Sequence, residues 1–128
     1  MARRMDKERT RAYYAALGPE DLCSCAACRN FSSRVREAYP DSAAFLDGMG
    51  ADIAKPHESW SLELREGELE YPEVQYVILG SVGDFRPTEI SGVRFGLADA
   101  WPPTGLEEPH FVIEAGPFRL EWPGEAPE

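Results

Sequence analysis

The sequence predicts an α+β domain in which three short N-terminal helices pack on one face of a mainly antiparallel sheet of about five to six strands. Apolar residues near the N-terminus recur every three or four positions, as on one side of a helix, whereas those after residue 58 alternate. No helical segment separates the later strands, and parallel strands would need such crossovers. We expect one domain over residues 1–128, with a helical part at about 5–50, a β part at about 58–123 and a frayed tail at 124–128.

The helical part is expected to contain three helices. The first covers 5–17, and the Gly-Pro pair at 18–19 ends it, because glycine suits the position after a helix and proline cannot continue one. The second covers about 25–39, with Ser24 as the N-cap residue whose side chain accepts from the free amides of the first turn. The third covers 40–47 and begins with proline, whose missing amide is tolerated there.

The first strands follow a linker. Trp60, Leu62 and Leu64 alternate with polar residues, which predicts a strand with one buried face. A glycine turn then leads to a return segment at 69–71. The run at 74–79 is β-branched and aromatic, which is typical of a central strand.

The C-terminal part contains three further segments. A strand with an interruption near Gly92, such as a bulge, is expected at 88–97. Consecutive prolines make 98–109 irregular. The strand-like segments 110–114 and 118–122 flank an Ala-Gly-Pro sequence at 115–117, and this spacing predicts a β-hairpin.

The charge is concentrated in the second half of the chain. Residues 1–56 carry nine basic and eight acidic side chains, whereas residues 57–128 carry four basic and fifteen acidic ones. Such a field keeps a small protein soluble, repels nucleic acid and anionic lipid, and favours a basic protein partner. No apolar run approaches the ~20 residues of a membrane span, and no apolar segment follows the charged N-terminus. We therefore expect no secretory signal and a cytoplasmic protein.

All three cysteines lie within six positions, at Cys23, Cys25 and Cys28. In a reducing compartment such a cluster favours a metal site, a redox pair or core thiols over a structural disulfide. Cysteines three apart on a helix share one face, and a third on the preceding turn can reach the same point, as zinc requires. Zinc is therefore the cofactor that this cluster would bind if it is a metal site.

A structural zinc site takes four ligands, so one more is needed. His57, in the linker after the helices, is the candidate fourth ligand. His110 is the alternative, and Asp21 is a weaker candidate.

Two other interpretations of the cysteines stay open. Cys25 and Cys28 continue the apolar stripe of their helix, and free cysteine is often buried. A thiol at a helix N-terminus is acidified by free amides, which suits redox chemistry. A thioredoxin-like motif would follow a strand, however, and here a helix precedes it.

No other motif indicates catalysis. The sequence contains no phosphate-binding loop, no Gly-x-Ser-x-Gly and no His-Glu-x-x-His, and neither histidine has a nucleophile beside it. The sequence therefore favours a small non-enzymatic binding protein. Trp101, in the proline-rich loop, is the candidate anchor for a partner.

The first half of the chain resembles a group of short uncharacterised bacterial proteins that share an N-terminal Cys-x-Cys-x-x-Cys-basic-Asn-aromatic motif. The residues that carry the resemblance are Cys23-Ser24-Cys25-Ala26-Ala27-Cys28-Arg29-Asn30-Phe31, followed by Tyr39-Pro40, Phe45-Leu46 and Gly50 to Lys55-Pro56. That group has no assigned activity. The resemblance therefore implies that the motif defines a structural unit, and it implies no reaction.

Overall fold

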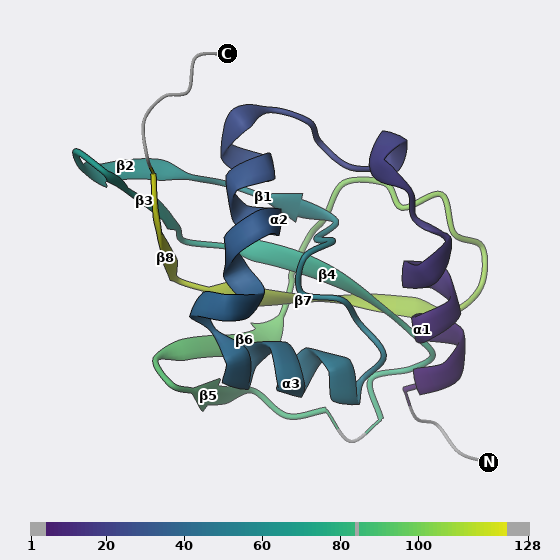
Figure 1. Ribbon diagram of the computed structural model, residues 1–128. Helices are drawn as coiled ribbons and strands as arrows, with labels where there is room; N and C mark the ends of the chain where they lie inside the picture. Colours follow the sequence, from purple (N-terminus) through teal and green to yellow (C-terminus); the bar gives the residue numbers. More distant parts are fainter. Residues whose placement is uncertain (1–4, 84, 123–128) are drawn as a thin grey trace.

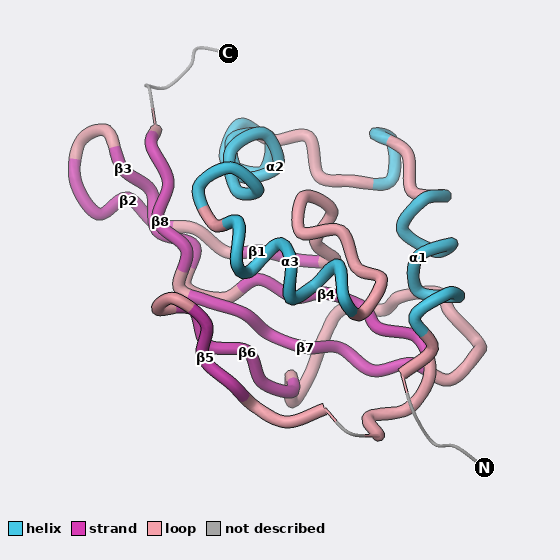
Figure 2. Tube along the Cα trace, turned by 60° about the horizontal axis from the view of Figure 1, so that its bottom comes forward, coloured by secondary structure: helices cyan, strands magenta, loops and turns pink. Residues whose placement is uncertain are grey.

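The computed structural model describes residues 5–83 and 85–122, so the predicted tail at 124–128 lies outside the described residues. Three α-helices lie together on one side of the strands, which confirms the predicted α+β class (Figures 1 and 2). The helices are α1 (Lys7–Ala16), α2 (Ala26–Ala38) and α3 (Pro40–Gly48), with a short 3-10 turn η1 (Pro19–Asp21) before α2. Among the described residues, no helix has the length and apolarity needed to cross a membrane.

The strands form two antiparallel sheets. A five-stranded sheet has the order β1-β4-β7-β6-β5, and a three-stranded sheet has the order β2-β3-β8. The strands are β1 (Glu58–Ser59), β2 (Leu62–Arg65), β3 (Glu68–Tyr71), β4 (Val74–Leu79), β5 (Thr88–Ile90), β6 (Val93–Leu97), β7 (His110–Gly116) and β8 (Phe118–Glu121).

The two sheets are successive parts of one bent ladder. β3 continues into β4 and β7 continues into β8, with Tyr71 opposite Phe118 in one sheet and Val74 opposite Ala115 in the other. The hairpin predicted between 110–114 and 118–122 is therefore wrong, because β7 pairs with β4 and β6, whereas β8 pairs with β3.

Gly116 explains the difference. A Cβ atom at this position would lie 2.1 Å from the Pro72 carbonyl oxygen, so the two strands approach each other here more closely than any side chain allows. Glycine in a strand often marks such an approach of two backbones. The Gly-Pro sequence thus forms a bend within a long strand and does not form a turn between two strands.

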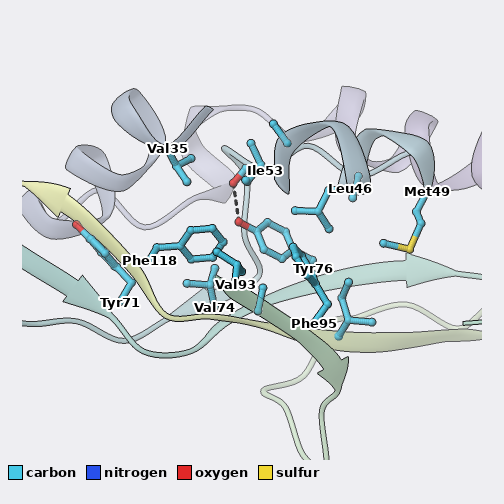
Figure 3. Close-up of a cluster of buried hydrophobic side chains, with 14 of the residues drawn as sticks. Val35, Leu46, Met49, Ile53, Tyr71, Val74, Tyr76, Val93, Phe95 and Phe118 are labelled. Atoms are coloured by element: carbon cyan, nitrogen blue, oxygen red, sulfur yellow. Dashed lines mark hydrogen bonds between the residues drawn. The ribbon is translucent and has the colours of Figure 1, made fainter. Parts of the chain in front are cut away.

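The main core lies between the helices and the sheets. Phe31 of α2 is fully buried in this core. Val35 of α2 and Leu46 of α3 are also fully buried and lie on the side of the helices that faces Tyr76 and Phe118 (Figure 3). Each such side chain contributes roughly 1.5–3 kcal/mol by leaving water. The Tyr76 hydroxyl donates to the Ile53 carbonyl at 2.7 Å, which satisfies the polar end of a buried ring.

The irregular segment at 98–109 is confirmed and covers part of the opposite face of the five-stranded sheet. Val77, Leu79 and Val112 form a second small cluster there, against which Ala98 and Leu106 pack. The central strand β4 is consequently buried along its whole length.

Helix side chains cover two strand edges. Beyond β1, the edge of β4 is covered by α1, where the Tyr14 hydroxyl donates to the Val77 carbonyl at 2.8 Å and Thr10 Oγ1 accepts from the Leu79 amide at 3.0 Å. The edge of β8 meets α2 and its C-cap residue Tyr39, whose hydroxyl accepts from the Arg119 amide at 2.9 Å. Edge strands left open invite pairing with other chains, and these contacts prevent it.

The edge strand β2 differs from prediction. Trp60 and Leu62 are 44% and 47% exposed, so the expectation that they lie on a buried face is wrong. The β2–β3 hairpin extends beyond the helices (Figures 1 and 2).

We predict that Gly116→Ala destabilises the protein by about 1–3 kcal/mol, because the added methyl group overlaps the Pro72 carbonyl. Gly96→Ala is the matched control, since a Cβ atom there meets nothing within 4 Å. The control should change the free energy of unfolding by less than about 1 kcal/mol. Urea denaturation measures both variants, and equal losses would contradict the close approach.

Candidate metal centre

The cysteines lie where the loop after η1 enters α2. Cys25 is the N-cap residue, with φ −68° and ψ 163°, and its Sγ accepts from the Cys28 amide at 3.4 Å. The prediction of Ser24 as the N-cap is therefore wrong by one residue. The Ser24 carbonyl instead accepts from Arg29 Nη1 at 2.9 Å, which holds the loop against the first turn of the helix.

The three thiols converge. The Sγ atoms of Cys23, Cys25 and Cys28 all lie within 4.8 Å of one another. Zinc bonded to sulfur at about 2.3 Å in a tetrahedron places its sulfurs about 3.8 Å apart, so small side-chain rotations bring these atoms to that spacing. Cys23 and Cys25 are exposed and Cys28 is partly buried, which excludes the core-thiol interpretation for the first two.

Partly buried hydrogen bonds fix the first turn of α2 on the sheet. The Tyr71 hydroxyl donates to the Ala27 carbonyl at 2.6 Å, and Asn30 Nδ2 donates to the Glu121 carbonyl at 2.9 Å. Arg34 Nε in turn donates to Asn30 Oδ1 at 2.8 Å, which sets the orientation of the amide. The asparagine of the cysteine motif thus positions the helix that carries the thiols.

A cleft of about 100 Å³ adjoins the thiols. Its lining consists of residues from the cysteine loop, α2 and the segment around β1: Asp21, Leu22, Cys23, Cys28, Ser32, Pro56, His57, Glu58 and Ser59. Cys28 Sγ is hydrogen-bonded to Ser59 Oγ at 3.7 Å across this cleft. The structure thus places His57 in the same cleft as two of the three cysteines.

The hydrogen bond of His57 defines its tautomer. Nε2 lies 2.8 Å from the Pro102 carbonyl oxygen, which can only accept, so Nε2 carries the proton. The Nδ1 atom of the neutral ring is then unprotonated and has the lone pair that a metal ligand needs. Metal-binding histidines commonly donate their other ring N–H to a carbonyl in this way.

The other two candidate ligands have different surroundings. Asp21 lines the cleft, and its Oδ2 accepts from the Gly18 amide at 2.9 Å. His110 is bonded at both ring nitrogens, with Nδ1 2.9 Å from the Glu108 carbonyl and Nε2 3.0 Å from Thr104 Oγ1. Within the described residues, the group close enough to share one ion contains the cysteines alone.

Trp101 lies in the loop between β6 and β7 and is 38% exposed. The residues on either side are anchored, because the Ala100 carbonyl accepts from Gln75 Nε2 at 2.9 Å and the Pro102 carbonyl accepts from His57. The loop that presents the indole is therefore tied directly to the histidine of the cleft.

The pKa values of two of the thiols are shifted in opposite directions. The Cys28 amide that donates to Cys25 Sγ lowers the pKa of Cys25 below its ordinary value. Burial, together with a hydrogen bond to Cys23, raises the pKa of Cys28 to about 12. Near neutral pH the metal-free site thus contains an exposed, acidified thiol next to one that stays protonated.

Sequence reasoning missed two residues of the site. Arg29 follows the last cysteine directly, and a basic residue at that position in the motif could have indicated that it fixes the loop. Ser59 contacts Cys28 from a strand of two residues, and nothing in its sequence context indicates this contact.

Comparisons of the chain with protein-family models, with curated proteins and with solved structures find no match.

We predict that iodoacetamide modifies Cys25 at least about tenfold faster than Cys28 at pH 8 in the reduced, metal-free protein, because the thiolate is the reactive form. Peptide mass spectrometry over a time course measures the two rates. In urea the difference should vanish, since it arises from the fold. Equal rates in the folded protein would contradict the assigned acidities.

Proposed function

We propose that the chain binds a metal ion, zinc above all, through Cys23, Cys25, Cys28 and Nδ1 of His57. The convergence of the three sulfur atoms within 4.8 Å carries the proposal. Three thiolates and one imidazole are a donor set that zinc takes in tetrahedral structural sites. The unprotonated Nδ1 of His57 supports its role as the fourth ligand.

Charge and compartment fit this proposal. Three thiolates around a divalent ion leave one net negative charge, and the Arg29 guanidinium, bonded to the loop between two of the cysteines, offsets it. A reducing compartment such as the cytoplasm keeps the thiols available as ligands. Bound zinc would join the cysteine loop, α2 and the segment before β1, and so would serve the structure.

We predict close to one zinc per chain, measured by elemental analysis, in protein purified without a chelator or an immobilised nickel column. Cys25→Ser is the most informative variant, because a serine hydroxyl keeps the N-cap hydrogen bond and loses the soft ligand. Loss of a residue that only hydrogen-bonds to a metal ligand lowers metal affinity about 10- to 100-fold. Because Cys25→Ser removes a ligand itself, it should lower zinc affinity by more than that.

His57→Gln tests the fourth ligand. Glutamine can still donate to the Pro102 carbonyl but offers no Nδ1, so zinc affinity should fall at least about tenfold. His110→Gln is the matched control and should leave affinity unchanged. Competition with a chromophoric chelator measures both variants.

Failure of zinc to bind at any stoichiometry would overturn the metal proposal. Reversible formation of a Cys25–Cys28 disulfide in that metal-free protein would then favour thiol redox chemistry, which the opposite acidities of these two thiols support.

A second proposed function is the binding of a basic protein by the acidic half of the chain. The fifteen acidic and four basic side chains of residues 57–128 supply the field, and the exposed Trp101 supplies an apolar contact. Neither role requires catalysis, in keeping with a non-enzymatic protein.

We predict that basic partners are retained on the immobilised chain and that retention falls steeply as NaCl rises from about 50 to about 500 mM, because salt screens the interaction. Mass spectrometry identifies the retained proteins. Trp101→Ser should weaken retention further. Acidic partners alone, or retention insensitive to salt, would contradict this second function.

A further inference from the structure

The strand edges of this fold differ in whether helix side chains hydrogen-bond to them. Side chains of α1 hydrogen-bond the edge of β4, and those of α2 and its C-cap residue Tyr39 hydrogen-bond the edge of β8. β2 is the outer strand of the three-stranded sheet, and within residues 5–83 and 85–122 no strand pairs with its outer edge. A strand edge in this state presents free amides and carbonyls to any extended chain.

Two large, exposed apolar side chains lie within β2 or just before it. Trp60 directly follows β1 and Leu62 begins β2, and they are 44% and 47% exposed. The other open edges are shorter, since β1 has two residues and β5 has three, with Pro87 directly before β5.

The charge around β2 specifies the partner. The segment 58–73, which contains β1, β2 and β3, carries six glutamates and a single arginine. That arginine, Arg65, is itself paired with Glu68 at 3.3 Å. A second copy of the chain would bring two acidic edges together, whereas a basic segment would be attracted.

We propose that the outer edge of β2 is a docking site for an extended basic segment of a partner protein, which joins the three-stranded sheet as a fourth strand. Main-chain hydrogen bonds to the free edge would supply affinity. Trp60 and Leu62 would contact apolar side chains of the segment, and the glutamates would select its basic ones. The inference rests on the proposed binding of a basic protein and names the surface and the form of the bound segment.

The probe is a library of short peptides in which lysine or arginine alternates with valine, isoleucine or tyrosine, titrated against the full chain. An acidic library with glutamate in place of the basic residues is the control. We expect basic peptides alone to bind, and hydrogen exchange to slow in the amides of residues 62–65 when they do. Binding with protection elsewhere would overturn the β2 site.

Matched variants test the surface. Leu62→Lys adds a positive charge that repels a basic peptide. It should weaken the binding of the tightest peptide at least about tenfold. Leu97→Lys is the control, because Leu97 is exposed to a similar extent, 45%, and lies on β6. Equal effects of the two substitutions would overturn the site, and circular dichroism confirms that both variants fold.

Backbone methylation tests strand addition itself. In a β-ladder only every second amide of the peptide faces its partner strand, so methylating alternate amides in one frame should abolish binding and in the other frame should preserve it. Equal binding of the two frames would overturn strand addition while leaving the binding of a basic protein intact. Absence of binding by every basic peptide would overturn the β2 site, whereas salt-dependent retention of basic proteins on the immobilised chain tests the second proposed function separately.

Discussion

The hydrogen bonds between the start of α2 and the bent ladder are the constraint on which the rest of the structure depends. Tyr71 is fully buried at the end of β3, and its hydroxyl donates to the carbonyl of Ala27, in the turn that carries the cysteines. Asn30 extends the same attachment to β8. A buried polar group without a hydrogen-bond partner costs about 1–3 kcal/mol of stability. Any other placement of the helix would break these hydrogen bonds and is therefore unfavourable. The convergence of the thiols is a consequence of this fixed turn.

The bend in the ladder provides the second constraint. At Gly116 the β7 backbone approaches Pro72 so closely that only glycine fits, and beyond this point the three-stranded sheet diverges from the five-stranded one. The bend brings Tyr71 and Phe118 against Phe31 of α2. It also carries the β2–β3 hairpin away from the helices, which leaves Trp60 and Leu62 in solvent.

The class of fold and the cysteine cluster could be predicted because both depend on local patterns. The change from helical to alternating periodicity located the helices and most strands, and three cysteines in six residues cannot lie far apart. The hairpin was mispredicted because Gly-Pro is common in turns, whereas Gly116 responds to a contact distant in sequence. Alternation at Trp60 and Leu62 predicted a buried strand face, but whether anything covers a face depends on tertiary structure. The sequence likewise offered no reason for His57 and Pro102 to meet.

The way α1 attaches to β4 affects how this chain tolerates cleavage and fusion. The helix satisfies the β4 edge through Thr10 and Tyr14, and the Asp6 amide adds a bond to the Leu79 carbonyl. Release of α1 after proteolysis between it and the cysteine loop would leave backbone groups unpaired along the edge of β4. Open edges of apolar strands promote the assembly of sheets into insoluble aggregates. A tag placed before α1 has to leave that helix free to pack against β4. The packing of α1 is thus required for solubility as well as for folding.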